Sequence, residues 1–379
     1  MTSIAPETVR SDPERTRRRA EELFDPDLSP VLRRLGQRPR GAADAATLHP
    51  DDAAARADVA DMLVELGFLA AGEAGPAVAD LVEVAELIGS ALYQSPFLDT
   101  VTAADLLAAD PRYDALRTEI AAGERTVALA WREDGRGEPH HPAPLRLDAA
   151  GRTVTGVRRF VAFAPDVDLL LVVGRAGVED RLVLIAPDAP GVRLRRQDDI
   201  GRGDLYEVTF DAAAVAAPGS GPAGERYPQA LARARIRHAA YLAGLASGAI
   251  ELSAQRLRDR TAFGRPLASM QALAFRLAAL AAETTAVLAF AREAAQRADR
   301  GADVRLAGAQ AAFLAADVAR TASAEAVHLH GASGMTEGCD AQVFYRRAAV
   351  DASWLGTPTG LRIEAARLLA AGYAAEKRD

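Results

Sequence analysis

The sequence predicts an α+β fold in three parts: an N-terminal helical domain at 13–122, a central β domain at 123–217 and a C-terminal helical bundle at 226–379. Two observations lead to this prediction. Short segments rich in β-branched residues, separated by Gly, Pro and Asp turns, occupy the middle of the chain. Segments with apolar residues at helical spacing lie on both sides of them.

The N-terminal domain is predicted from helical periodicity. Residues 51–70 place their apolar side chains on one face, and residues 76–93 repeat the pattern after Pro76, which suits a first helical turn. A loop that starts at Gln94 then leads into a further helix, which is expected to begin at Ala103. The face of the first helix consists of Val59, Met62, Leu63, Leu66 and Leu69.

The central domain contains six short segments that are typical of strands. Turn residues separate them, so the region is predicted to be an all-β, barrel-like module. The Gly- and Pro-rich stretch 218–228 is interpreted as a linker to the next domain. The six segments are 125–131, 152–163, 168–174, 181–187, 191–197 and 204–210.

The C-terminal part contains three long helical segments, Arg233–Arg260, Leu267–Arg300 and Asp303–His330. Each is longer than an ordinary globular helix, and short turns with glycine join them. Short connections make neighbouring helices antiparallel, which predicts a four-helix bundle. The alanine-rich faces of this bundle are expected to be buried against another copy or a homologue, because a monomer would expose them as large apolar patches.

Composition restricts the class of protein. The net charge of -7 and pI near 5.5 argue against nucleic acid as the main partner. A single cysteine, Cys339, allows no internal disulfide and fits a reducing compartment. The first residues lack the apolar region of a secretory signal, and no run of 18 apolar residues is free of charge. A cytoplasmic location without a membrane span is therefore expected.

The turn between the first two long segments carries residues that a turn does not need. It reads Arg260, two further residues, Phe263 and Gly264, and Gln271 follows seven residues after that glycine. Gly264 and Pro266 suffice to make the turn. A capped turn with a core phenylalanine is the purely structural alternative.

A second motif identifies a family. Residues 324–348 read AEAVHLHGASGMTEGCDAQVFYRRA, which resembles the QxHGGxGxT and YRRA stretch of acyl-CoA dehydrogenases. The turn at 260–271 resembles that family's RxxFGxxLxxxQ motif, and the order of the three domains is the family's architecture. The stretch 90–107 is similar to actinobacterial members, some of which act in heteromeric pairs.

This resemblance implies an oligomer that binds FAD between subunits. Arg260 and Gln271 match the residues that reach the diphosphate and adenosine end of a neighbouring subunit's FAD, with Phe263 packed beside them. An arginine suits this role because its planar fork of donors matches diphosphate oxygens.

The second motif departs from the family pattern. His328 stands in place of the glutamine, and Gly331-Ala332 in place of the paired glycines, while Gly334 and Thr336 are kept. His328, Gly331 and Gly334 are thus expected at the cofactor. Alternatively, His328 and His330 are only favourable charges at a helix C-terminus. A metal site is not expected, because no third ligand is near in sequence.

The expected flavin-ring contacts are altered. Trp131 and Arg132 replace part of the family's TEPxxGSD stretch, although Trp131 could also be a core residue. Phe160 and Ala162 fall on its Lys-x-Trp-Ile-Thr stretch, so aromatic bulk is retained and the hydroxyl that bonds flavin N5 is lost. Thr357 is a further expected contact.

The catalytic turn lacks its acid. Counting from YRRA, the family's Glu-Gly-Thr falls on Leu355, Gly356 and Thr357. Some members place the base before an arginine on the first bundle helix, and here Ala234 precedes Arg235. The resemblance therefore puts Arg235, Leu355 and Gly356 at the substrate and leaves the catalytic base unknown. Loss of a general base typically lowers the rate by about 10²- to 10⁴-fold.

Two acidic residues lie near the altered turn. Asp351 is one helical turn before Leu355, and Glu364 lies beyond the turn. Either could replace the base, but both are expected to be solvated or capping residues.

Three functions remain open at this point. The first is a subunit for α,β-dehydrogenation of an acyl-CoA, bulky substrates included, that lacks its own base and pairs with a homologous catalytic subunit. The second is a flavin-dependent oxygenase or oxidase on the same fold. The third is a non-enzymatic acyl-thioester-binding scaffold.

Overall fold

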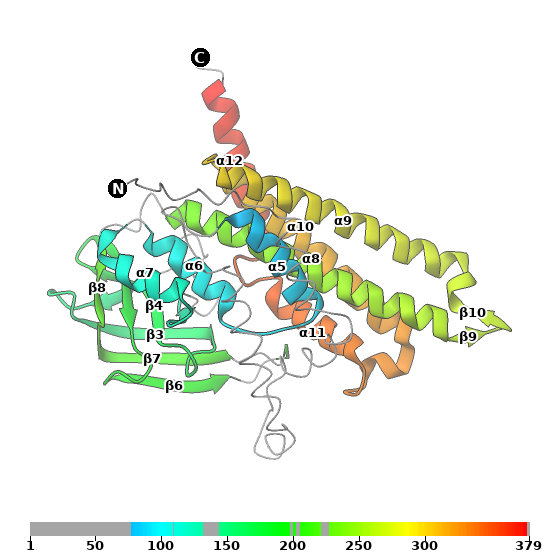
Figure 1. The fold of residues 1–379 in the computed structure, drawn as a ribbon, viewed down its shortest axis with the longest axis horizontal. Coiled ribbons are helices and arrows are strands. Elements are labelled where there is room, and N and C mark those ends of the chain that lie inside the picture. The colour runs from blue at the N-terminus through cyan, green and yellow to red at the C-terminus, as the bar shows by residue number, and fades with distance from the viewer. Residues whose placement is uncertain are drawn as a thin grey trace, which may run out of the picture.

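The computed structural model describes residues 77–108, 110–131, 144–197, 200–201, 205–220 and 227–376. The predicted helix at 51–70 and Arg132 lie outside these residues. A sheet occupies one end of the described molecule and a bundle of long helices extends away from it, with short helices packed along both (Figure 1). The order of helical, β and helical parts is the one that the sequence predicts.

The described N-terminal part is helical. It consists of α5 (Val78–Ser90), α6 (Phe97–Leu107), the 3-10 turn η1 (Pro111–Tyr113) and α7 (Asp114–Ala121). Helix α6 begins six residues before the predicted Ala103. Pro96 precedes its first residue, and the Ser95 hydroxyl accepts a hydrogen bond from the Phe97 N–H at 3.3 Å. Because this Ser-Pro start holds the chain in place, the connection from α5 is short and sits close to α8.

The central part is a curled, mixed sheet with the strand order β6-β7-β3-β2-β4-β5-β8, and β1 pairs with β4. Strands β1 and β2 run parallel to β4, and the remaining pairs are antiparallel. Two short strands, β2 and β8, were not predicted, since β2 has only three residues and β8 lies where a linker was expected. The strands are β1 (Val127–Leu129), β2 (Leu145–Leu147), β3 (Thr153–Ala162), β4 (Leu169–Ala176), β5 (Glu179–Ile185), β6 (Val192–Gln197), β7 (Leu205–Ala214) and β8 (Ala217–Ser220).

Strand β3 is irregular at its end. Its register against β7 shifts between Arg158 and Val161, and Phe160 has a positive φ of 55°. The Phe160 N–H is not lost, because it donates to Gln197 Oε1 at 2.8 Å. A bulge of this kind re-aims the side chains that follow it, and here Ala162 and Phe163 end on the wall of a cavity.

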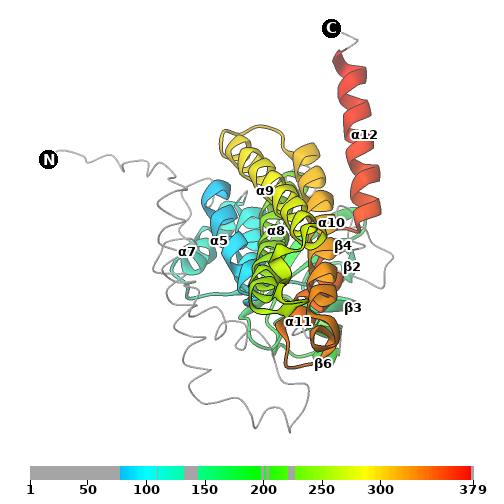
Figure 2. The same cartoon turned by 90° about the vertical axis from the view of Figure 1, so that its right-hand side faces the viewer.

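The C-terminal part is the predicted bundle. Its three long helices are α8 (Tyr227–Asp259), α9 (Gln271–Asp299) and α10 (Arg305–His330), with 33, 29 and 26 residues. A hairpin of β9 (Thr261–Ala262) and β10 (Arg265–Pro266), followed by the 3-10 turn η2 (Leu267–Ser269), joins α8 to α9. The chain ends with η3 (Gly331–Met335), α11 (Asp340–Asp351) and α12 (Pro358–Glu376), and α12 projects beyond the rest (Figure 2).

Two glycines bring α5 into backbone contact with α8. A Cβ on Gly89 would lie 1.9 Å from the Tyr241 carbonyl oxygen, and one on Gly244 would lie 1.9 Å from the Glu86 carbonyl oxygen. The Asp299 carboxylate also accepts from the backbone N–H groups of Val78 and Ala79, at 2.8 and 3.0 Å, which caps α5 from another helix. These contacts fix the loop after α5 over the middle of α8.

Helix α9 is apolar and largely exposed. Among the described residues it is the helix long and apolar enough to cross a membrane by length and composition, with a mean hydropathy of 1.6 over its most apolar window. It packs along α8 and α10, and only 22% of that window is buried. Phe275, which is 65% exposed, stands at its start.

Candidate functional site

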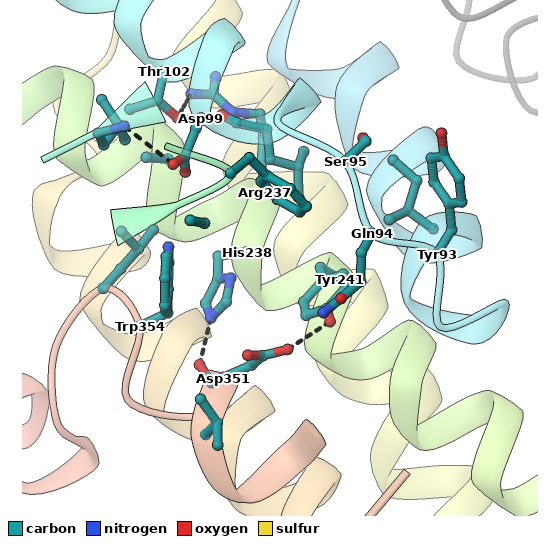
Figure 3. A pocket seen from close by; sticks show the side chains of 18 of the residues that line it. Tyr93, Gln94, Ser95, Asp99, Thr102, Arg237, His238, Tyr241, Asp351 and Trp354 are labelled. Carbon is teal, nitrogen blue, oxygen red and sulfur yellow. Dashed lines mark hydrogen bonds between the residues drawn. The ribbon is translucent and has the colours of Figure 1, made fainter. Parts of the chain in front are cut away.

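A cavity of about 110 Å³ lies where the three parts of the molecule meet. Its walls come from the α5–α6 loop, the middle of α8, the end of α11 and the edge of the sheet (Figure 3). Much of the wall is hydrocarbon, including Leu98, Leu129, Ala162, Phe163, Ala234 and Leu355. The cavity has room for several water molecules.

Leu355 and Ala234 face this cavity together. Ala234 lies on α8 and Leu355 in the turn between α11 and α12, and they are only 3% and 6% exposed within one apolar cluster. The sequence assigned both positions to the missing base, and the structure brings them to one place. Neither side chain can accept a proton, and the cavity wall at that place is hydrocarbon.

Arg235 holds the turn that carries Leu355. Its guanidinium is 2% exposed, and its Nε donates to the Leu355 carbonyl oxygen at 3.0 Å. Its Nη1 donates to Glu364 Oε1 at 2.8 Å. Arg235 therefore contacts the backbone of the turn and holds the turn in position.

The rest of the turn has a structural explanation. Gly356 has a φ of 131°, and a Cβ there would meet Leu361 Cδ2 at 3.0 Å. The Thr357 hydroxyl accepts from the Gly360 N–H at 3.1 Å, at the start of α12. Both residues therefore stabilise the tight turn between α11 and α12.

Asp351 and Glu364 are not the solvated residues that were expected. Asp351 is 9% exposed, lines the cavity and accepts a hydrogen bond from the Tyr241 hydroxyl at 2.6 Å. The Glu364 side chain is 19% exposed and paired with Arg235. The expectation failed because it rested on distance along the chain, whereas α8 packs beside both residues and supplies a partner to each.

Asp99 is a second acid on the cavity, at the start of α6. Its Oδ2 accepts from the Leu129 N–H at 3.2 Å, and its carboxyl also bonds the Trp354 side chain. Burial raises the pKa of Asp99 to about 7, although these two hydrogen bonds act in the opposite direction. Asp99 therefore changes charge near neutral pH.

The residues expected at a flavin ring lie in different parts of the structure. Trp131 is 6% exposed in the core, edge-on to Tyr227 with ring centroids 6.0 Å apart, which is the core alternative that the sequence left open. Phe160 is half-buried at the bulge of β3, and Ala162 lines the cavity. The structure supplies no hydroxyl at Ala162, as the sequence indicated.

Arg260, Phe263 and Gln271 lie at the far end of the bundle from the sheet. They stand on and beside the β9–β10 hairpin, and all three are exposed. Phe263 is 94% exposed, and with Gly264 it forms a two-residue turn in which both φ values are positive, 53° and 76°. A core phenylalanine is thus excluded. The Phe263 side chain extends into solvent from a backbone conformation that is disfavoured for a large residue.

His328 lies in a polar surface groove near the end of α10. The groove has a volume of about 800 Å³ and is lined by Arg276, Arg320, Thr321 and Tyr345 as well. His330 is instead buried, with Nδ1 2.7 Å from the Ala326 carbonyl oxygen. The two histidines therefore differ, and only His328 is available to a ligand in the groove.

The glycines of the second motif also differ. Gly334 is buried against the backbone of α10, where a Cβ would lie 2.6 Å from the Val327 carbonyl oxygen. Gly331 ends α10 with a φ of 62° and has open space around it. Glycine is thus required at position 334 because the backbone of α10 lies so close, and at position 331 because of the positive φ.

Four functional groups of the cavity were not predicted: Asp99, His238, Tyr241 and Gln94. His238 and Tyr241 follow Ala234 at positions i+4 and i+7 of α8, so they share its face. That spacing of polar rings along an otherwise apolar face is the signal that could have identified them. Gln94 carries no such signal, because it reaches the cavity only through the packing of α5 on α8.

Comparison with known proteins relates this three-part fold to the acyl-CoA dehydrogenases. Residues 225–373 match the family described as acyl-CoA dehydrogenase, C-terminal domain. A curated relative, acyl-CoA dehydrogenase FadE28 of Mycobacterium tuberculosis, is 29% identical over 235 residues. Another, acyl-CoA dehydrogenase IpdE2 of Mycolicibacterium smegmatis, is 26% identical over 290 residues. These alignments cover 60% and 76% of this chain, and 65% and 78% of the relatives.

Solved structures share the fold over nearly the whole chain. The ChsE4-ChsE5 complex of Mycobacterium tuberculosis aligns with a TM-score of 0.75 at 23% identity, covering 93% of this chain and 97% of that one. A variant of the Tcur3481-Tcur3483 steroid ACAD aligns with 0.80 at 24% identity, covering 95% and 98%. A glutaryl-CoA dehydrogenase of Mycobacterium smegmatis in complex with FADH2 aligns with 0.80 at 16% identity, covering 95% of each.

Residues 225–373 therefore match the family's C-terminal domain, and the chain has the fold of the solved acyl-CoA dehydrogenase structures over nearly its whole length.

Proposed function

We propose that the chain is an acyl-CoA dehydrogenase-type subunit that lacks its own catalytic base and pairs with a homologous subunit that has one. In this assignment it takes part in the α,β-dehydrogenation of an acyl thioester. Its contribution is to complete the binding site of the neighbour's FAD. Proton abstraction belongs to the partner.

One observation carries the proposal: residues are retained where they face outward and altered where they face the chain's own cavity. Arg260, Phe263 and Gln271 lie at the end of the bundle and are exposed among the described residues. Leu355 and Ala234, by contrast, close the cavity wall with hydrocarbon. This difference favours a subunit that serves another subunit's site.

The described residues fit one part of FAD well. The exposed Arg260 guanidinium offers a fork of donors for diphosphate oxygens, and Gln271 lies at the start of α9 beside it. The groove around His328 contains the cations Arg276 and Arg320 together with the acids Asp317 and Glu325, and Arg276 is paired with Glu325. When bound, FAD accepts the hydride that leaves the acyl chain.

The fit is poorer toward the flavin ring of the chain's own cavity. Ala162 provides a methyl group where a hydroxyl would be needed to bond the ring, and Trp131 is packed in the core. Arg235 keeps the turn at Leu355 in place through its backbone, but the turn carries no acid. We therefore place the reacting flavin in the partner's cavity.

Exposed apolar surface supports an assembly. On α12, Leu369 and Tyr373 are 47% and 62% exposed, and on α9 Phe275 is 65% exposed. Helix α12 packs on α10 only near its start, through Leu361 and Ala365. A second acyl-CoA dehydrogenase-like subunit that covers these faces would remove them from water. The two-subunit names of the ChsE4-ChsE5 and Tcur3481-Tcur3483 structures are consistent with such a pair.

The direct experiment measures turnover of an acyl-CoA with an artificial electron acceptor, for the purified chain alone and after co-expression with a homologous subunit that carries the glutamate. We expect no turnover and no yellow colour for the chain alone, and both for the pair. Turnover by the chain alone would disprove the missing base. A chain that is yellow alone and consumes oxygen without dehydrogenating an acyl-CoA would favour a flavin-dependent oxygenase or oxidase, and a chain that is never yellow would favour a scaffold.

A further inference from the structure

One wall of the cavity is polar, although an acyl chain needs only hydrocarbon around it. This polar wall consists of Gln94 from the α5–α6 loop, His238 and Tyr241 from α8, and Arg347 and Asp351 from α11. The labelled residues among them point toward one another across the cavity in Figure 3. The wall therefore gathers hydrogen-bonding groups from three separate elements.

The polar wall is held in a fixed arrangement. Tyr241 donates its hydroxyl proton to Asp351 Oδ2 at 2.6 Å, and the His238 Nε2–H donates to the Asp351 carbonyl oxygen at 2.8 Å. The rings of His238 and Tyr241 stack with centroids 5.6 Å apart. Because Tyr241 has used its only proton, its oxygen can only accept a further hydrogen bond.

An acceptor in the same wall lacks a partner. Among the described residues, Gln94 Oε1 is buried and receives no hydrogen bond. On the opposite wall, Arg237 donates to Asp105 Oδ2 at 2.7 Å and to the Thr102 hydroxyl at 3.1 Å, although among the described residues Arg237 Nε and Asp105 Oδ1 also make no hydrogen bond. A buried acceptor without a donor costs stability, so it indicates a donor that arrives with a ligand.

We infer that the polar wall recognises a hydroxyl group carried by the acyl chain at a distance from its thioester. A hydroxyl donates to acceptors such as Gln94 Oε1 and Tyr241 Oη and can accept in return. A second carboxylate would face Asp351, and an ammonium group would face Arg347, whose Nε is 4.0 Å from Asp351 Oδ2. A neutral donor is therefore preferred. The inference rests on the proposed binding of acyl thioesters.

The spacing along α8 sets where the hydroxyl must be. Ala234, beside Leu355, marks the place where the family's base would act, and Tyr241 lies seven residues further along the helix. At 1.5 Å per residue this is about 10 Å. The hydroxyl is thus several carbons away from the carbons that a dehydrogenase would oxidise. Since Leu355 and Ala234 supply no base, the acyl group in this cavity is a bound ligand that this chain does not convert.

The test compares matched thioesters. Calorimetry on the full chain, or on the chain in its complex, measures the Kd of an ω-hydroxyacyl-CoA and of the unsubstituted acyl-CoA of equal length. The acyl chains have roughly six to twelve carbons, so that the hydroxyl group is placed at a different depth of the cavity in each pair. The variants are Tyr241→Phe and Gln94→Leu. Tyr373→Phe, an identical change at an exposed position of α12, is the control. Thermal unfolding checks that each variant is folded.

We expect the hydroxyl to improve Kd by about tenfold at one favoured length, which is the effect of one good hydrogen bond. Tyr241→Phe and Gln94→Leu should each reduce this ratio toward one, while Tyr373→Phe leaves it unchanged. Equal affinities for the two thioesters at every length, or a ratio that neither variant changes, would overturn the inference and leave the proposed function standing. If neither kind of thioester binds, the inference and the acyl-thioester function both fail.

Discussion

At the scale of single residues, the two positions where the resemblance places the family's base carry side chains that cannot accept a proton. Leu355 and Ala234 are hydrocarbon on a shared wall. Arg235 is paired with Glu364 through Nη1 and with the backbone of the turn through Nε, and its predicted role at the substrate stays a prediction. Asp351, an acid on the same cavity, accepts a hydrogen bond from the Tyr241 hydroxyl.

Adding an acid at the turn should not by itself create a dehydrogenase. We expect Leu355→Glu in the purified chain to show no turnover of an acyl-CoA above that of the wild type, because Ala162 still lacks the hydroxyl that a flavin ring requires. The measurement is reduction of an artificial electron acceptor in the presence of added FAD. Turnover by this variant alone would mean that a single residue separates the chain from competence, and it would weaken the assignment of a partner.

Asp99 should give the chain a pH-dependent stability. Its pKa of about 7 in the fold lies above its ordinary value of 3.8, so the folded state holds the proton more tightly than the unfolded state. Its contribution to stability is therefore fully present below about pH 4 and is lost as the pH rises to about 7. We expect Asp99→Asn to gain in thermal midpoint relative to the wild type as the pH rises through this range. Midpoints of the two proteins that stay parallel between these pH values would contradict the shift.

At the scale of elements, the cavity depends on how closely α5 packs on α8. Gly89 and Gly244 allow the two backbones to touch, and the loop after α5 then places Gln94 beside Tyr241. Arg292 on α9 supports the same helix, because it donates to Glu83 and Glu86 at 2.6 Å each. These contacts explain why the short α5–α6 loop can form part of the wall.

A methyl group at this contact should be costly. Gly244→Ala would place a carbon 1.9 Å from the Glu86 carbonyl oxygen, and because both sides are backbone we expect a loss of about 3 kcal/mol or more. Gly372→Ala is the matched control, since nothing lies within 4 Å of a Cβ there and an exposed helix gains about 0.5 to 1 kcal/mol from the change. Thermal unfolding of the two variants measures the difference. Similar midpoints would show that the α5–α8 contact is looser than described.

The same elements show what the sequence could and could not predict. The long helices follow from apolar periodicity, and the three exceed 25 residues as expected. Helix α6 starts earlier than predicted because Ser95 and Pro96 organise its first turn, and β2 is too short to show a pattern. The places of Leu355 and Ala234 were predicted by counting from motifs. The burial of Asp351 and the role of Gln94 were not, because both depend on a helix that is distant in sequence.

At the scale of the whole molecule, two elements project from the surface and expose apolar side chains. Helix α12 projects from the bundle, and the β9–β10 hairpin projects at the end away from the sheet (Figures 1 and 2). Both carry exposed apolar side chains, Tyr373 on the helix and Phe263 on the hairpin. A partner subunit that covers them would also bring its cofactor to Arg260.

The chain should therefore not sediment as a monomer. At micromolar concentration we expect a dimer or larger assembly, alone or with the homologous subunit, because the exposed faces of α9 and α12 are apolar. Sedimentation velocity measures this directly. A monomer in both preparations would show that these faces do not form a stable interface.

The central claim is that this chain completes a neighbour's FAD site. The most direct test is the flavin content of the complex with a homologous subunit that carries the base, measured as visible flavin absorbance relative to protein. It compares the wild type, Arg260→Ala and the control Arg258→Ala on the preceding helix. Loss of a charged hydrogen-bonding fork should weaken FAD binding by about tenfold or more, so Arg260→Ala should lose flavin while Arg258→Ala retains it. Full flavin occupancy in the Arg260→Ala complex would contradict the claim.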